Sequence, residues 1–321
     1  MISALIFSMN RIENVVRLAE KIRPYVDEIV IVDSSNKKNR KILEERLKDD
    51  KIRIYWFPPA GIVELYYEIG LELCSNEWVI HIEDDEDPSE DLLMDLRTLI
   101  EKFGEKYKIF RVLRGSKKKQ RIFRIFNKNY IIPTGVIHWT WAAKTNEILD
   151  LEEKYFIHHP DYLSLRDFTK TFRKYAVVES YQYGYKILAT IYKDFIGYQN
   201  PKSGVSQSVY RKIFKKFFEG TLRFSRKISF MISVTLYNLY LFFVGVKGKE
   251  PLRAFLYALF IQYELMRSFG KKYEIWLRMW EEGDPIKYAG MDSVENFNKI
   301  AEKLDPENGL KNFVALMERK V

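Results

Sequence analysis

The sequence predicts an α/β fold: a mainly parallel sheet with helices on both faces, followed by a helical C-terminal region. Strand-like and helix-like segments alternate up to about residue 104, and the last third changes to long apolar and amphipathic stretches. Such alternation is typical of parallel sheets, because each parallel connection needs a crossover that a helix usually supplies. The chain has 321 residues, enough for one large domain or two. We divide it into an α/β domain over residues 1–200 and a helical region over 201–321.

Four short apolar runs predict the parallel strands, and the segments between them have helical periodicity. The expected strands are Ile2–Ser8, Glu28–Asp33, Ile52–Phe57 and Trp78–Ile82. The expected helices are Ile12–Ile22, Lys38–Lys48, Ile62–Leu73 and Leu92–Phe103. Farther along, we expect short strands at 109–113, 121–126 and 156–158, an irregular stretch at 131–141, and a helix from Asp167 to about Lys193.

The net charge of +9 is concentrated in residues 202–227, which hold eight Lys or Arg residues and one acid, Glu219. On a helical wheel the basic and apolar residues fall on opposite sides, which predicts an amphipathic helix of the kind that lies on anionic membranes. Residues 228–246 then carry no charge, at the lower end of the ~17–25 residues that span a bilayer. A further apolar helix is expected from about Leu252 to Met266. The pattern fits surface docking, a transmembrane hairpin or a buried hairpin.

Residues 202–227 also fit a second class of protein, because their basic side chains alternate with Phe as in nucleic-acid-binding surfaces. The continuous apolar face argues against this class, and we expect no nucleic-acid partner. The single cysteine, Cys74, excludes an internal disulfide and fits a reducing compartment. The short apolar N-terminus indicates a strand rather than a signal peptide. The lack of CxxC and HExxH patterns argues against zinc.

Five consecutive acids, Glu83 to Asp87, directly follow the fourth strand. Adjacent carboxylates repel one another, and a hard cation such as Mg²⁺ or Mn²⁺ relieves that repulsion. The carboxyl end of a strand is also where ligands bind in α/β domains. The segment therefore predicts either a metal site or a solvated loop that caps the helix starting near Ser89.

Polar residues end three of the predicted strands: Ser8-Met-Asn10-Arg11, Asp33-Ser34-Ser35 and Glu83-Asp84-Asp85. In order and spacing, over about residues 1–180, they resemble glycosyltransferase family 2, which has the GT-A fold. The resemblance implies a nucleotide-sugar site in which Ser8 and Asp33 hold the nucleoside. It places three further residues at the donor, Asn10, Arg11 and Asp84. It makes Asp85 the main ligand of Mn²⁺ or Mg²⁺, with Glu83 beside it and Asp87 as a further ligand.

The middle of the chain resembles two branches of that family, the lipopolysaccharide-core glucosyltransferases and the dolichyl-phosphate-mannose-synthase-like members. The matching residues are Arg121-Ile-Phe-Arg124-Ile-Phe126, Gly135-Val-Ile-His138 and His158-His159-Pro160. Trp139 stands where relatives have a Glu that is a plausible general base. His138 and Asp87 are therefore the candidate catalytic residues, although a phosphate acceptor needs no base.

Several of these side chains have two readings. His138 or His158 can complete the metal shell, and we place His158 there. Arg121 and Arg124 can bind donor phosphate oxygens or form an exposed polar face.

The sequence thus predicts an inverting, metal-dependent hexosyltransferase that uses a UDP- or GDP-sugar. We expect a lipid-linked glycan acceptor and a peripheral or monotopic location at the cytoplasmic face of the cell membrane. A polyprenyl-phosphate mannose or glucose synthase is the alternative within the class.

Overall fold

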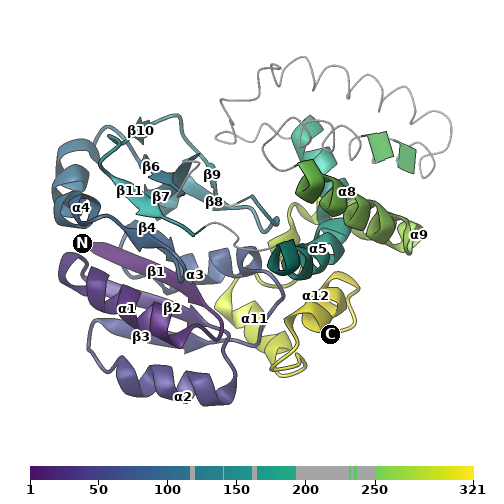
Figure 1. Cartoon of the computed structure of the whole chain (residues 1–321), viewed down its shortest axis with the longest axis horizontal. Coiled ribbons are helices and arrows are strands. Elements are labelled where there is room, and N and C mark those ends of the chain that lie inside the picture. The colour runs from purple at the N-terminus through teal and green to yellow at the C-terminus, as the bar shows by residue number, and fades with distance from the viewer. Residues whose placement is uncertain (116–119, 140, 161–164, 193–230, 233–234, 237–250) are drawn as a thin grey trace.

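The computed structural model describes residues 1–115, 120–139, 141–160, 165–192, 231–232, 235–236 and 251–321 (Figure 1). The basic segment 202–227 and most of 228–246 lie outside the described residues, so the membrane and nucleic-acid predictions attached to them stay predictions. Within the described ranges, no helix is long and apolar enough to cross a membrane.

One curled sheet of nine strands organises the described part of the chain. Its order is β3-β2-β1-β4-β7-β6-β11-β5, with β10 beside β6. The strands are β1 Ile2–Ser8, β2 Glu28–Asp33, β3 Ile52–Trp56, β4 Trp78–Glu83, β5 Asp87–Pro88, β6 Ile109–Arg114, β7 Gln120–Asn127, β10 Ile148–Asp150 and β11 Phe156–His158. The first four are parallel, whereas β7 runs antiparallel to β4 and β6. This mixed but mainly parallel sheet confirms the predicted α/β class.

Alternate side chains of the central strands pack into two different apolar cores, each shared with helices. Along β1, Ile2, Ala4 and Ile6 pack into one apolar core, and Leu5 and Phe7 pack into the other, as the two-residue period of a strand requires. The first core is shared with α1 (Ile12–Ile22) and α4 (Glu90–Phe103), and α2 (Lys37–Arg46) touches it through Leu43. The second is shared with α3 (Tyr67–Leu73) and the C-terminal helices.

Two segments differ from the sequence prediction in their local structure. The helix expected over Ile62–Leu73 begins as a separate 3₁₀ turn, η2 (Val63–Tyr66), before α3. The stretch expected to be irregular contains a short hairpin of β8 (Ile131–Pro133) and β9 (Trp141–Ala143). Both changes affect the site, because η2 carries Glu64 and the hairpin loop carries His138.

The C-terminal helices complete the second core of the sheet. They are α5 (Leu165–Tyr192), α8 (Pro251–Met266), α9 (Phe269–Glu282), α10 (Pro285–Tyr288), α11 (Val294–Ala301) and α12 (Gly309–Met317). Phe297 of α11 meets Phe57 and Tyr66 with ring centroids 5.2 and 5.6 Å apart. A Cβ on Gly61 would lie 2.6 Å from the Phe313 Cβ. The loop at Gly61 and helix α12 are therefore in close contact. The predicted division at residue 200 stays a prediction, but this core crosses it.

Candidate active site

The carboxyl ends of β1, β2 and β4 lie side by side at one edge of the sheet. Parallel pairing aligns Ser8 with Asp33 and Phe7 with Glu83. In open α/β sheets, ligands bind at this edge. The structure therefore brings together the three strand ends on which the sequence prediction depends.

Two buried oxygen atoms at the ends of β1 and β2 have no hydrogen-bond partner among the described residues. They are the Ser8 Oγ and the Asp33 Oδ2. The other carboxylate oxygen of Asp33, Oδ1, accepts a 2.6 Å hydrogen bond from the Ser35 Oγ. Burial raises the pKa of Asp33, and the Ser35 hydrogen bonds oppose that effect. Because buried polar atoms are nearly always paired, these two oxygens indicate a place for a polar ligand.

Asn10 joins the turns that follow β1 and β2. Its backbone has a φ of 61°, in the left-handed region that Asn tolerates better than most residues. Its backbone N–H donates to the Ser35 Oγ at 2.7 Å, and its Oδ1 accepts from the Asn36 N–H at 3.0 Å and the Asn39 Nδ2 at 2.9 Å. These contacts place Asn10 in the framework beside the predicted nucleoside site.

Glu83, Asp85 and His159 form a group that can hold a metal ion. One ligand atom of each lies within 4.8 Å of the others. Within the described part of the chain, the Asp85 Oδ1 is buried without a hydrogen bond, and the His159 Nε2 lies 3.7 Å from it. Burial and the charge of Arg114 lower the pKa of His159 against the pull of the acids, so its imidazole is neutral near pH 7. Two carboxylates and a neutral imidazole are ligands that Mn²⁺ accepts.

The histidine in this group is His159, one residue beyond the predicted ligand His158. Strand β11 pairs antiparallel with β5, which aligns His158 with Asp87. The His158 side chain is exposed and does not join the group. Successive side chains of a strand alternate in direction, so a shift of one position decides which histidine meets the acids.

A buried arginine, Arg124, contacts two of the acids. Arg124 is 1% exposed, and its Nη2 contacts the Glu83 Oε1 at 3.0 Å and the Glu86 Oε1 at 2.7 Å. Arg114 adds a 3.0 Å ion pair to the Glu83 Oε2 and a further one to Glu86. Burial works to raise the pKa of Glu83, but Arg124 and Arg114 outweigh it and lower the pKa to about 2. Glu83 is therefore anionic and held in place.

A β-bulge places Arg124 in this position. Phe110 of β6 pairs with Ile125, whereas the next residue, Arg111, pairs with Phe123. Arg124 is thus the extra residue of the bulge, and bulges commonly redirect side chains next to functional sites. Arg121, the second arginine predicted to bind phosphate, instead donates to the Leu151 carbonyl at 2.6 Å and lies 3.6 Å from Asp150.

His81 contacts the guanidinium group of Arg124. Its Nδ1 lies 2.9 Å from the Arg124 Nη1 and 3.0 Å from the Trp141 Nε1. Both neighbours are donors, so Nδ1 accepts and the ring is neutral. Burial, followed by the charge of Arg124, keeps the pKa of His81 well below its ordinary value. Trp141 stacks on Tyr67 at 4.2 Å and is 2% exposed, so it belongs to the core.

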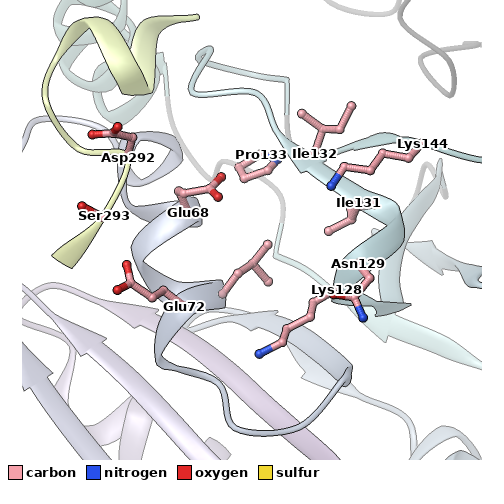
Figure 2. A pocket seen from close by; sticks show the side chains of 11 residues that line it. Glu68, Glu72, Lys128, Asn129, Ile131, Ile132, Pro133, Lys144, Asp292 and Ser293 are labelled. Carbon is pink, nitrogen blue, oxygen red and sulfur yellow. The ribbon is translucent and has the colours of Figure 1, made fainter. Parts of the chain in front are cut away.

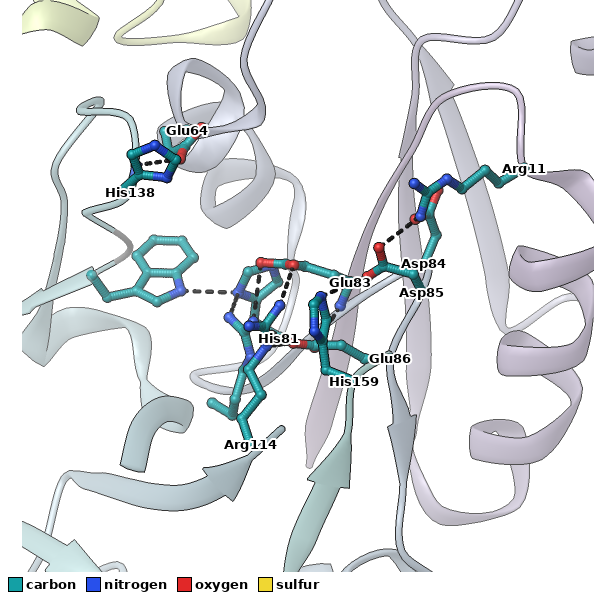
Figure 3. A network of polar contacts seen from close by, with 12 residues as sticks. Arg11, Glu64, His81, Glu83, Asp84, Asp85, Glu86, Arg114, His138 and His159 are labelled. Carbon is teal, nitrogen blue, oxygen red and sulfur yellow. Dashed lines mark hydrogen bonds and ion pairs between the residues drawn. The ribbon is translucent and has the colours of Figure 1, made fainter. Parts of the chain in front are cut away.

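Arg11 covers the opposite side of the acids. Its Nη1 donates to the Asp84 Oδ1 at 3.1 Å and to the Asp85 Oδ2 at 2.7 Å (Figure 3). Burial is the main cause that raises the pKa of Asp84 to about 7, while Arg11 opposes it. Arg11 is half exposed, so it can move when a cation or an anionic ligand enters.

Asp87 lies apart from the metal group. It forms ion pairs with Arg17 at 3.1 Å and Lys21 at 2.9 Å, both on α1. Burial works to raise the pKa of Asp87, but the two cations together lower it. The prediction of Asp87 as a ligand or catalytic group remains a prediction, and in this structure α1 holds its side chain.

His138, the other candidate catalytic residue, contacts Glu64. Its backbone φ of 66° is a left-handed conformation that costs roughly 1–3 kcal/mol outside glycine. The His138 N–H donates to the Glu64 Oε1 at 3.0 Å. The His138 Nε2 lies 3.1 Å from the Tyr257 hydroxyl and 3.8 Å from Glu179. Glu64 belongs to no motif in the sequence, which only placed it within the helix expected over Ile62–Leu73.

A separate pocket of about 550 Å³ opens between α3, the β8–β9 hairpin and the segment before α11 (Figure 2). Its charged lining residues are Glu68, Glu72, Lys128, Lys144 and Asp292. None of the residues of the metal group lines it.

No family model matches the chain. The curated relatives include two proteins described as uncharacterised glycosyltransferases, from Rickettsia felis and Rickettsia conorii. Each is 25% identical over 132 residues, which are 40% of this chain and 45% of the relative. The match thus spans less than half of the length of either relative. Both relatives confirm the predicted resemblance at the level of the enzyme class, glycosyltransferases, and neither identifies a branch of family 2.

Solved structures with a similar course of the polypeptide chain include two complexes with UDP or a UDP-sugar. TarS of S. aureus in complex with UDP-GlcNAc has 14% identity and a TM-score of 0.40, over 88% of this chain and 92% of that chain. Glucosyl-3-phosphoglycerate synthase from Mycobacterium tuberculosis, in complex with Mn²⁺, UDP and glucosyl-3-phosphoglycerate, has 12% identity and a TM-score of 0.39, over 56% and 79%. At these low scores, the neighbours carry no argument about this chain.

Proposed function

We propose that this protein is a metal-dependent glycosyltransferase that uses a nucleotide-sugar donor. One observation carries the proposal: at the carboxyl ends of adjacent strands lie three buried oxygens that have no hydrogen-bond partner among the described residues. They are the Ser8 Oγ, the Asp33 Oδ2 and the Asp85 Oδ1. The curated relatives support the class, and the strand-end geometry supports the site.

Ser8 and Asp33 are suited to the nucleoside. The Asp33 carboxylate accepts hydrogen bonds from N–H or O–H groups, and the Ser8 hydroxyl can both donate and accept. A base or ribose at this position would satisfy both oxygens. Because both oxygens are buried, each one costs about 1–3 kcal/mol while it has no partner, and a ligand that pairs with it removes that cost.

Glu83, Asp85 and His159 would hold Mn²⁺ or Mg²⁺ beside the nucleoside. The buried, unpartnered Asp85 Oδ1 and the oxygen- and nitrogen-rich ligand set fit a hard or borderline cation. When bound, the ion would neutralise the donor diphosphate and so ease its departure. Arg124 and Arg114 fix Glu83 and keep it ionised. Arg11, once released from Asp84 and Asp85, can pair with diphosphate oxygens.

We also propose that the transfer is inverting, that the acceptor is a lipid-linked glycan, and that the enzyme works at the cytoplasmic face of the membrane. The support is the sequence of 202–227 and 228–246, a basic amphipathic segment followed by an uncharged one. A basic helix of this kind binds anionic lipids with about 1 kcal/mol per Lys or Arg near the surface.

Thermal stability with a panel of UDP- and GDP-sugars, with and without Mn²⁺, tests the donor site. A ligand at ~100 times its dissociation constant stabilises the folded state by about 2.7 kcal/mol. We expect one nucleotide to stabilise the wild type only with the metal, and Asp85→Asn to lose the response. Asp50→Asn, an exposed acid in a turn, is the control and should respond like the wild type. No shift with any donor would contradict the proposal.

A further inference from the structure

Glu64 differs from the acids of the run Glu83 to Asp87 in having no ion-pair partner among the described residues. Glu83, Asp85 and Asp87 each pair with an arginine or lysine. The Glu64 carboxylate is held by two backbone N–H groups, its own and that of His138. Backbone donors fix the position of a carboxylate without adding a full positive charge. Glu64 is therefore held in place while its lone pairs remain available.

The location of Glu64 suits the acceptor side of the site. In Figure 3, Glu64 and His138 lie on one side of Glu83, and Arg11 and Asp85 lie on the other. Burial is the main cause that raises the pKa of Glu64, and the Glu83 charge adds to it. Burial likewise raises the pKa of Tyr67, with Glu83 and Glu64 both adding to the rise. Glu64 is half-buried, so a ligand can reach it. Glu64 is also near enough to the metal group for the charge of Glu83 to affect it.

The loop that carries the His138 N–H is hydrogen-bonded to a side chain of α5. The Ile137 N–H donates to the Gln182 Oε1 at 2.9 Å, and the Gln182 Nε2 donates to the Gly135 carbonyl at 2.8 Å. These bonds to α5 hold His138 in its left-handed conformation, which directs its N–H to Glu64. The arrangement fixes the Glu64 carboxylate from outside its own helix.

The other candidate bases are less suitable. Asp87 is paired with Arg17 and Lys21. The His138 Nε2 is taken up by the Tyr257 hydroxyl at 3.1 Å and by Glu179 at 3.8 Å. The pKa of His138 is lowered, chiefly by burial, to about 4, whereas burial and Glu83 raise the pKa of Glu64 to about 7. A general base works best with a pKa near the operating pH.

We propose that Glu64 is the catalytic base that takes the proton from the acceptor hydroxyl. The inference rests on the proposed function. As the acceptor O–H proton moves to the Glu64 carboxylate, the acceptor oxygen forms a bond to the anomeric carbon of the donor. The bond from that carbon to the diphosphate oxygen breaks, and its electron pair leaves with the nucleoside diphosphate. Charge and atoms balance without a further reactant.

The test uses the full chain, Mn²⁺ and the nucleotide-sugar that stabilises the wild type, with water as the acceptor. Two quantities are measured: donor affinity by calorimetry and release of nucleoside diphosphate. Glu64→Gln should bind the donor within about threefold of wild type and lose about 10²–10⁴-fold in release rate. Glu68→Gln, one turn farther along the same segment, removes an equal charge from a residue that lines the separate pocket. This control should keep both.

Two further readouts separate a base from a structural residue. The wild-type rate should rise with pH up to about 7, and Glu64→Gln should lose that dependence. Formate should restore release by Glu64→Ala, because a small carboxylate can fill the space left. If Glu64→Gln fails to fold, Glu64→Asp, which retains the charge, carries the test through the same pH profile.

Donor binding and release by Glu64→Gln at the wild-type rate would overturn the inference while leaving the proposed function intact. An equal loss of donor binding and rate would assign Glu64 a structural role and would also overturn it. A wild type that neither binds nor cleaves any donor would overturn both.

Discussion

Ser8 and Asp33 are register partners at the ends of two adjacent parallel strands, and each keeps one buried oxygen that no described residue hydrogen-bonds. Two such neighbours at the ligand-binding edge of a sheet mark a site that a polar ligand completes.

Ser8→Ala should therefore weaken donor binding without weakening the fold. The lost hydrogen bond should reduce affinity about tenfold, equivalent to about 1.4 kcal/mol. The unliganded protein should be as stable as wild type or slightly more so, because a buried unpaired hydroxyl is removed. Calorimetry and thermal unfolding measure the two effects. Ser3→Ala, on the same strand, is the control: its hydroxyl donates to Glu28, so it should lose stability and keep donor affinity.

Arg11 competes with a cation for the acids. Removing it with Arg11→Ala should raise Mn²⁺ affinity in the absence of nucleotide about three- to tenfold, since one positive charge leaves Asp85. The same change should lower affinity for the nucleotide-sugar, because its diphosphate loses a partner. Arg17→Ala is a matched control with nearly the same exposure, 49% against 50%, and it contacts Asp87 instead. Equal effects of the two variants would count against this account of Arg11.

The buried charge of Arg124 balances Glu83 and Glu86. Arg124→Met leaves both acids without that partner, which should cost about 3–5 kcal/mol of unfolding free energy. Urea denaturation measures the loss. Arg121→Met, three residues earlier on β7 and partly exposed, should cost about 0–1 kcal/mol. A small loss for Arg124→Met would show that the acids do not depend on it.

The pKa of Glu64 predicts a pH effect on stability. Burial raises the folded-state pKa to about 7, with Glu83 adding to the shift and Lys186 and the His138 N–H opposing it. A raised carboxyl pKa favours the folded state at low pH, and this contribution is lost as pH rises toward 7 and above. Glu64→Gln has no such group, so its melting temperature relative to wild type should increase from pH 5 to pH 8. Glu44→Gln, on the surface of α2, should show no such trend.

The sheet and its strand ends were predictable because they depend on local patterns. Apolar runs of four to seven residues ending in Ser8, Asp33 and Glu83 define strands and their carboxyl ends. Parallel pairing then brings those ends together. The order in the chain was enough, because the connections in such folds follow few topologies.

The supporting residues were not predictable, because each depends on a detail of tertiary structure. His159 rather than His158 joins the acids because of the phase of a three-residue strand. Arg124 reaches Glu83 through a bulge that no residue type announces. Glu64 meets His138 only once the hairpin loop is folded over η2. The amphipathic pattern of α11 and α12 shows a buried face but not the sheet that covers it.

The most direct test of the central claim is Mn²⁺ binding followed by electron paramagnetic resonance, with UDP or GDP present. The account predicts that wild type binds the ion, that Asp85→Asn abolishes binding, and that His159→Ala weakens it. His158→Ala, the neighbouring histidine, should bind as the wild type does. A wild type that binds no Mn²⁺, or equal losses for the two histidine variants, would contradict the site described for this protein.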